Sequence, residues 1–163
     1  MKILMILSKC PYNDIRVQKE RKALQAAGHE VEVLWFNQVD NETGKKMGGP
    51  KPYLVIKWSI GCYKVFSHEE DWDAIHCHDL DTLLMGILIK RRIGCKLLVY
   101  DSHEYYLWTF RRFRDKLGYP YFWLLQFIAQ RYVDHLIVIS ETMRQYFLRR
   151  YNFKQITIVR NTQ

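Results

Sequence analysis

The stretch DAIHCHDLDTLLMGILIKRRIGCKLLVYDSHE, residues 73–104, places an apolar helix-like segment between two short β-type runs. The runs are DAIHC (73–77) and KLLVY (96–100), and the segment between them contains LLMGILIK (83–90), which is apolar nearly all round. A helix that is apolar on every side is buried inside a protein. Because strands that alternate with buried helices form parallel sheets, this stretch predicts an α/β fold.

The predicted helix carries suitable residues at both ends. Asp79 or Asp81 is expected to cap its amino end, because a short carboxylate accepts hydrogen bonds from the free backbone amides there. The basic residues 90–92 complement the carbonyl dipole of the last turn, and Gly94 follows them. The helix should therefore end before Gly94 and pack deeply.

The same alternation continues along the rest of the chain. Five further β-type runs are KILMIL (2–7), EVEVLWF (30–36), YLVIK (53–57), HLIVI (135–139) and ITIV (156–159). No linker or internal repeat divides the sequence, so residues 1–163 are expected to form one domain. The predicted fold is a doubly wound, Rossmann-like α/β domain with a parallel sheet of about six to seven strands.

Two other helices have clear signals at their ends. Asn13 or Asp14 can cap a helix that runs to about Ala27, after which Gly28 supplies a left-handed stop. Ser140 can cap the last helix of the chain. These helices lie between predicted strands, as a parallel sheet requires.

The composition is that of a folded globular chain, with 163 residues and 48% hydrophobic content. No stretch approaches the roughly 18 uninterrupted apolar residues of a spanning helix, and the opening apolar run is too short for a signal peptide. The four cysteines lie far apart, with no CxxC pair. Free thiols and a cytoplasmic location are therefore expected.

The chain is basic, with a formal net charge of +8. One arginine cluster lies within residues 111–114 and another within residues 144–150, and both stand beside aromatic residues. One interpretation is an anionic partner, and the other is a set of solvated helix faces. A nucleic-acid partner is not expected, because the chain has no recognised nucleic-acid-binding motif.

Polar residues follow five of the predicted strands. They are Ser8, His78 with Asp79, Asp101 to Glu104, Ser140 with Glu141, and Asn161 with Thr162. Parallel strands end at one edge of a sheet, where ligands bind in such folds, so these residues predict a site assembled from several loops. For Asp79 and Ser140 helix capping is the other interpretation, and both roles can coexist.

The motif HCHD, residues 76–79, raises the question of a metal. Two histidines separated by one residue point the same way on a strand. A metallohydrolase pattern of the HxHxDH kind fails here, since Leu80 and Asp81 follow, and no second histidine pair completes the set. We therefore expect no metal, with His76 packed and His78 facing a ligand. Phosphate-binding glycine loops and a GxSxG elbow are also missing.

Four segments together resemble the amino-terminal domain of family 4 glycosyltransferases of the GT-B fold. They are YNDIRVQKERKALQAAGHEVEVL (12–34), DAIHCHDLDTLLMGILI (73–89), KLLVYDSHEYY (96–106) and VDHLIVISETMRQYF (133–147). The closing IVRNTQ also resembles the stretch with which that family leaves its first domain. The sequence departs from the family at Ile15, where proline is frequent, and lacks a glycine pair after the first strand.

The resemblance implies transfer of a sugar from a nucleotide-sugar donor to a glycan or lipid-linked acceptor, without a cofactor or metal. It also implies that this chain is the acceptor-side half, one half of a GT-B fold, and that the carboxyl-terminal, donor-binding domain is absent from it. The isolated chain is therefore expected to be inactive. The alternative is a non-catalytic module of the same fold that binds a sugar or lipid.

The resemblance also implies roles for individual residues. His103 stands where the family places a histidine that approaches the donor sugar, so it is the expected catalytic residue, with Asp101 and Glu104 orienting it. The residues expected to bind substrate are Asp14, Arg16, Lys19, His78, Asp79, Asp101, Ser102, Glu104, Ser140, Glu141 and Asn161.

Residues 107–127 combine four basic residues with eight aromatic ones. Such a segment suits an anionic membrane surface, and related enzymes use membrane acceptors, so a peripheral place on the inner face of the membrane is one hypothesis. The other is a helix pair whose aromatic side chains are core and whose arginines are solvated.

Overall fold

The computed structural model describes residues 1–8, 14–35, 56, 60, 71–104 and 118–160. Its centre is a parallel sheet of six strands in the order β2-β1-β3-β4-β5-β6. The strands are β1 (Lys2–Leu7), β2 (Glu30–Trp35), β3 (Ala74–His78), β4 (Leu97–Ser102), β5 (His135–Val138) and β6 (Ile156–Ile158). The predicted α/β fold is confirmed, while the expected run at residues 53–57 lies almost wholly outside the described residues.

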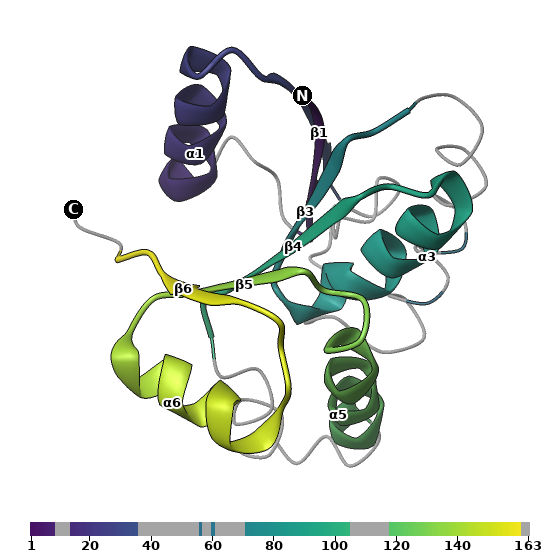
Figure 1. Ribbon diagram of the computed structural model, residues 1–163, viewed down its shortest axis with the longest axis vertical. Coiled ribbons are helices and arrows are strands. Elements are labelled where there is room, and N and C mark those ends of the chain that lie inside the picture. The colour runs from purple at the N-terminus through teal and green to yellow at the C-terminus, as the bar shows by residue number, and fades with distance from the viewer. Residues whose placement is uncertain (9–13, 36–55, 57–59, 61–70, 105–117, 161–163) are drawn as a thin grey trace, which may run out of the picture.

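Helices cover both faces of this sheet (Figure 1). They are α1 (Ile15–Ala26), α3 (Leu83–Ile93), α5 (Gly118–Ala129) and α6 (Glu141–Arg150), with a short 3-10 turn, η2 (Leu80–Thr82), before α3. In Figure 1, α1 lies on one face, and α3, α5 and α6 lie on the other. The sheet is therefore doubly wound, as predicted.

The side chains of β1 divide between two hydrophobic cores. Ile3, Met5 and Leu7 pack toward α1 with Val17, and form the smaller core. Leu4 and Ile6 point to the other face and join the larger core with α3, α5 and α6. Alternate residues of a strand face opposite sides of a sheet, so a continuous apolar run is what a strand covered on both faces requires.

Two of the predicted helix caps are confirmed. The side chain of Asp14 accepts hydrogen bonds from the backbone amides of Arg16 and Val17, at 3.1 and 3.4 Å. Ser140 Oγ accepts one from the amide of Met143 at 3.2 Å. Gly28 has a φ of +82°, the left-handed conformation expected after α1.

The predicted cap of α3 by Asp79 or Asp81 is wrong. The turn η2 lies between β3 and α3, so the cap position falls to Thr82, and neither aspartate makes a capping hydrogen bond. Thr82 Oγ1 instead donates to the backbone carbonyl of His78 at 2.9 Å, tying the start of α3 to the end of β3. The sequence showed a helix but not the extra turn that precedes it.

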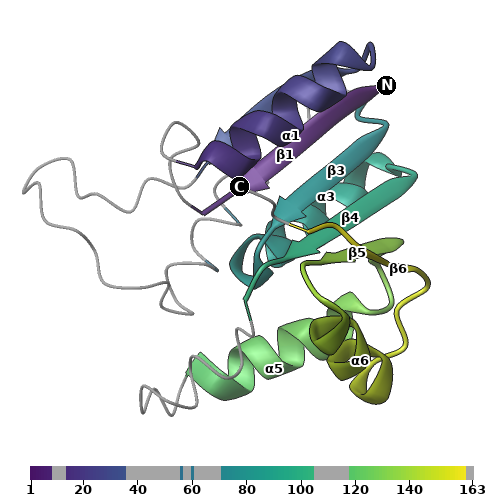
Figure 2. The same cartoon turned by 90° about the vertical axis from the view of Figure 1, so that its left-hand side faces the viewer.

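Two strands extend further than the sequence predicted. His78 belongs to β3, and Asp101 and Ser102 belong to β4, because the parallel ladder pairs His78 with Asp101 and Ser102 with Val138. These polar side chains are thus held by a rigid sheet rather than by loops. In Figure 2 the arrowheads of β1, β3 and β4 point to the same edge. His78, Asp101 and Ser102 stand at this end of β3 and β4.

Candidate active site at the carboxyl edge of the sheet

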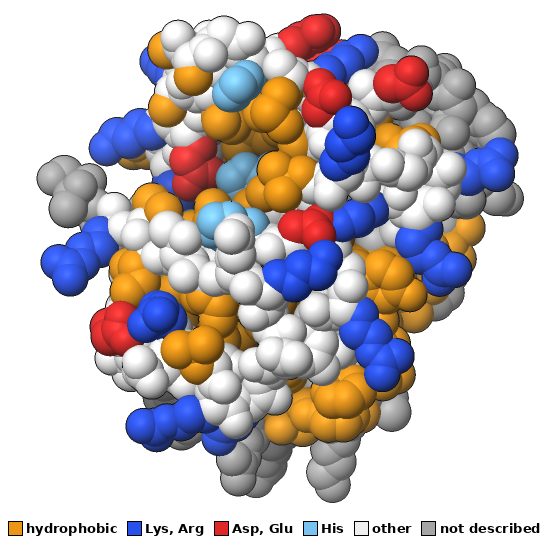
Figure 3. Space-filling view, viewed as in Figure 1, with side chains coloured by type: hydrophobic (Ala, Val, Ile, Leu, Met, Phe, Trp, Pro, Cys, Tyr) orange, Lys and Arg blue, Asp and Glu red, His pale blue; other side chains and the backbone are white. Residues whose placement is uncertain are grey.

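A pocket lies at the edge where β1, β3 and β4 end. The strand order reverses here, since β2 and β3 pair with opposite sides of β1, and such a reversal leaves a crevice in which α/β proteins bind ligands. The described residues lining the pocket are Leu7, Ser8, Asp14, Arg16, His78, Asp79, His103 and Glu104. Figure 3 shows histidine and acidic side chains close together on the molecular face seen in Figure 1.

His103 and Asp101 form the shortest polar contact described around this pocket. His103 Nε2 lies 2.5 Å from Asp101 Oδ2, and the carboxylate of Asp101 is fully buried. Burial alone would raise the pKa of Asp101, but the hydrogen bond with His103 and the neighbouring ring of His78 outweigh it and hold the pKa well below its ordinary value. Asp101 is therefore ionised and accepts the Nε2 proton of His103.

This hydrogen bond fixes the tautomer of His103. With the proton on Nε2, the lone pair of the neutral ring is on Nδ1. Nδ1 is buried and has no hydrogen-bond partner among the described residues. His103 therefore offers the pocket a nitrogen that can accept a proton or, once charged, donate one.

Two further histidines, His76 and His78, lie behind His103. His78 Nδ1 is 3.5 Å from Asp101 Oδ2, and the rings of His76 and His78 stack with centroids 4.3 Å apart. His76 is buried, as predicted, and burial followed by the influence of His78 lowers its pKa to about 3. His76 is therefore neutral at physiological pH.

Glu20 reaches this group from α1 and was not among the residues predicted from the sequence. Its Oε2 atom lies 3.7 Å from His78 Nε2. Burial, and then the nearby charge of Asp101, raises the pKa of Glu20 to about 8. The sequence does contain an indication of this position. Glu20 stands three residues after Val17 and four before Leu24, on the inward side of α1, where a carboxylate is unusual.

Arg16 and Asp14 bring opposite charges to the pocket. Arg16 Nη2 lies 3.2 Å from Asp14 Oδ2, and both side chains keep some exposure to solvent. Because Asp14 also caps α1, the ion pair is held at the start of that helix. A partly exposed guanidinium at a helix start suits contact with a phosphate or a sugar hydroxyl.

Asp79 has an unusual backbone conformation. Its φ is +68° and its ψ is 164°, a region that residues with a side chain rarely enter. Its amide donates to the carbonyl of Asp101 at 2.9 Å, which holds the strained residue against β4. Burial raises the pKa of its carboxyl, and the side chain lines the pocket. Strain held in this way is a feature of functional sites.

The remaining predicted site residues are not among those that line the pocket. Lys19 is exposed on α1, and Ser102 is buried with its Oγ donating to the carbonyl of Glu104 at 3.4 Å. Ser140 caps α6, and Glu141 bonds to Gln145 on that helix. Asn161 lies outside the described residues.

Known structures define the class of this fold. Sucrose-phosphate synthase from Thermosynechococcus elongatus matches with a TM-score of 0.71 at 14% identity, over 98% of this chain and 48% of that chain. A second structure of that synthase matches with a TM-score of 0.68 at 16% identity, over 100% of this chain and 90% of that chain. The chain thus has the Rossmann-like fold of one half of a GT-B protein.

The family follows from the sequence match. The model of Glycosyltransferase Family 4 matches residues 16–162, so the chain belongs to that family. This confirms the resemblance seen in the four segments. No curated protein matches the sequence at a significant level.

Proposed function

We propose that this chain is the acceptor-side half of an enzyme that transfers a sugar from a nucleotide-sugar donor to a glycan or lipid-linked acceptor. Family membership supports the reaction class. The observation that carries the proposal is His103, held by a buried aspartate at a pocket where the strand order reverses. No cofactor is needed in this scheme, since the nucleotide sugar is itself a substrate.

His103 acts on the sugar in this scheme. During transfer the bond from the anomeric carbon to the nucleotide phosphate breaks, and an acceptor oxygen bonds to that carbon and loses its proton. The free Nδ1 of His103 can accept a hydrogen bond from a sugar hydroxyl, and the protonated ring can stabilise negative charge. Asp101 is the positioning residue, because it fixes the ring and its tautomer.

Other pocket residues would orient the substrates. Arg16 offers a cation for a phosphate, whereas Asp14, Asp79 and Glu104 offer carboxylates for sugar hydroxyls. Donor and acceptor would thus meet above the ends of β1, β3 and β4.

We also propose that transfer requires a second domain. The chain spans 48% of the first matched synthase structure, and the pocket is open at the sheet edge, where a second half would close over it. A non-catalytic module of the same fold is the alternative, but family membership does not favour it. The deciding assay measures transfer from a panel of nucleotide sugars by the two-domain protein and by its His103→Ala variant, which lacks the imidazole.

An anionic membrane is the partner that we propose for α5. This helix buries Phe122 and Leu125 but leaves Trp123, Leu124 and Phe127 between 42 and 49% exposed. The rings of Trp123 and Phe127 stack with centroids 5.6 Å apart. An apolar helix face with large aromatic side chains suits the head-group region of a membrane. The basic residues 111–116 precede α5 in the sequence but lie outside the described residues.

Within the part of the chain that the structure describes, no helix is long and apolar enough to span a membrane. The proposed contact would therefore be peripheral. A lipid-linked acceptor held in the same membrane would then lie close to the pocket. The cytoplasmic leaflet, with its anionic lipids, is the surface that this proposal favours.

A further inference from the structure

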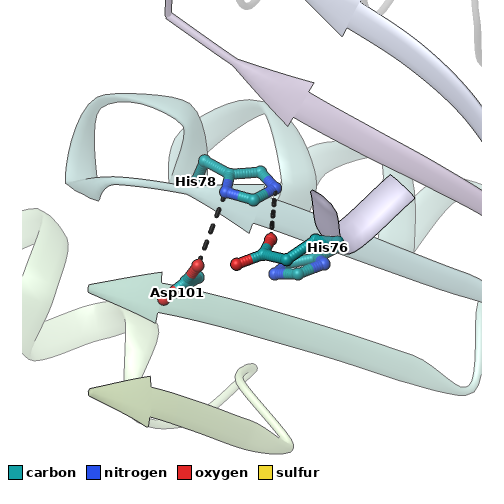
Figure 4. Close-up of side chains that lie close together, drawn as sticks. His76, His78 and Asp101 are labelled. Atoms are coloured by element: carbon teal, nitrogen blue, oxygen red, sulfur yellow. Dashed lines mark ion pairs between the residues drawn. The ribbon is translucent and has the colours of Figure 1, made fainter. Parts of the chain in front are cut away.

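Four side chains from three elements converge behind His103. His76 and His78 come from β3, Asp101 from the neighbouring strand β4, and Glu20 from α1. Each offers one nitrogen or oxygen atom, and the four atoms all lie within 4.8 Å of one another. Figure 4 shows that the rings of His76 and His78 and the carboxylate of Asp101 gather in one place between the strands.

Three side chains of this cluster are buried, that of Glu20 is 26% exposed, and the cluster is poorly hydrogen-bonded. His76 is 8% exposed, His78 is 2% exposed and Asp101 is 0% exposed. Among the described residues, no hydrogen-bond partner exists for His76 Nε2, for either ring nitrogen of His78 or for Asp101 Oδ1. Glu20 Oε2 is also buried without a hydrogen-bond partner among the described residues. Buried polar atoms are almost always satisfied, so an entire group of unsatisfied ones indicates a missing ligand.

The spacing of these atoms is compatible with a cation between them. One donor atom from each residue lies within 4.8 Å of the others, and His78 Nε2 is 3.7 Å from Glu20 Oε2, too far for a strong hydrogen bond. Donor atoms around a tetrahedral ion with bonds of about 2.0 Å stand roughly 3.3 Å apart. The cluster, whose donor atoms now lie within 4.8 Å of one another, would therefore contract when it encloses an ion.

The chemistry of the donors narrows the choice of ion. Imidazole nitrogen is a ligand for zinc and other late first-row metals, while calcium and magnesium prefer oxygen alone. Two carboxylates supply the charge that balances a divalent cation. The charge of Arg16 reaches Glu20, but the guanidinium is paired with Asp14. A closed set of four protein ligands is typical of a structural zinc site.

We propose that Glu20, His76, His78 and Asp101 bind one divalent late first-row metal ion, with Zn²⁺ as the best match. The ion would join α1 to the centre of the sheet and hold Asp101 from behind. Asp101 Oδ1 is the oxygen left for the metal, because Oδ2 is taken by His103. Carboxylates that bridge a metal and a histidine in this way orient both.

The proposal revises the expectation of a metal-free domain. That expectation rested on the absence of a further ligand after the HCHD motif, but Asp101 and Glu20 reach the motif from distant parts of the sequence. The metal site does not depend on the proposed sugar transfer, since binding can be measured on this chain alone.

The test is metal binding by the 163-residue chain after treatment with a chelator. Calorimetric titration with Zn²⁺ should show one site per chain, and bound zinc should raise the melting temperature. Replacing Glu20 by Gln keeps the side-chain size but removes a charged ligand, so it should weaken binding at least tenfold. His76→Asn should do the same. Glu32→Gln, which alters an exposed carboxylate on β2, is the matched control and should leave binding unchanged.

X-ray absorption at the zinc edge is a second test, and it does not depend on whether the variants fold, because it uses only the unaltered chain. The proposal predicts imidazole and oxygen ligands at about 2.0–2.1 Å. A zinc–sulfur distance of about 2.3 Å would show binding by cysteine and overturn the proposal. Absence of stoichiometric zinc, or equal binding by the Glu20→Gln and Glu32→Gln proteins, would also overturn it.

Discussion

Asp101 has two partners within the candidate site, and its position explains the role proposed for His103. Its carboxylate is buried at the end of β4, accepts the Nε2 proton of His103 and lies beside His78. Because the hydrogen bond with His103 and the nearby ring of His78 keep Asp101 ionised despite burial, it remains an acceptor across the physiological pH range. The neighbouring histidine is thereby held in one orientation, with Nδ1 free.

Replacing His103 by Ala should lower kcat/KM for sugar transfer by about 10²- to 10⁴-fold, the usual contribution of a positioned acid–base group. The fold should be unaffected, since the side chain lies at a strand end rather than in either core. Steady-state kinetics of the protein that carries both halves provides the measurement. His135→Gln is the control, because His135 lies at the start of β5 and bonds to Thr157. A loss smaller than about threefold would remove His103 from the mechanism.

At the scale of elements, the contact between α3 and β3 depends on Gly86. A Cβ atom added there would lie 2.2 Å from Cys77 Sγ and 3.1 Å from Leu98 Cδ1. Alanine favours a helix over glycine by up to about 1 kcal/mol, but overpacking in a core costs about 1–3 kcal/mol. Packing therefore outweighs helix propensity at this position.

Gly86→Ala should reduce the free energy of unfolding by about 1–2 kcal/mol in denaturant titrations. The double variant Gly86→Ala, Cys77→Ala should recover part of this loss beyond additivity, because it removes the clashing sulfur. Arg92→Ala, on the exposed side of α3, should change stability by less than about 0.5 kcal/mol. Additive effects of the two core substitutions would show that the helix does not approach the strand so closely.

The exposed face of α5 predicts binding to anionic vesicles. Sedimentation with such vesicles should retain the protein at low salt and release it as screening increases. The substitutions Trp123→Ser and Phe127→Ser should weaken binding, because they remove the inserted side chains. A variant with serine in place of Arg111, Arg112 and Arg114 should also bind more weakly, because it has lost positive charge. Ile15→Ser, an exposed residue on the opposite helical layer, is the control. If the unaltered protein does not sediment with anionic vesicles at low salt, the membrane proposal is wrong and a soluble acceptor is favoured.

The sequence predicted elements better than it predicted contacts between them. The runs around residues 73–104 gave β3, α3 and β4 because strand and helix periodicity are local properties. Asp79 did not cap α3, since the inserted turn η2 has no distinct pattern of its own. Glu20 could not be assigned to the site, because its approach to His78 depends on how α1 packs over the sheet.

For the whole molecule, the sheet and pocket form one half of the proposed enzyme. The chain supplies a histidine, an arginine and several carboxylates at one sheet edge. Among the described residues that line this pocket, Arg16 is the one with a permanent positive charge to offer a nucleotide diphosphate. Full neutralisation of a diphosphate would then require contacts from a second domain.

The central claim is tested most directly by measuring sugar transfer with the 163-residue chain and with the same chain joined to a donor-binding domain. Labelled nucleotide sugars and glycan or lipid-linked acceptors serve as substrates, and the labelled product is counted. We expect transfer by the two-domain protein, loss of transfer with His103→Ala, and no transfer by the chain alone. Transfer by the chain alone, or none by the two-domain protein across the nucleotide-sugar panel, would contradict the central claim.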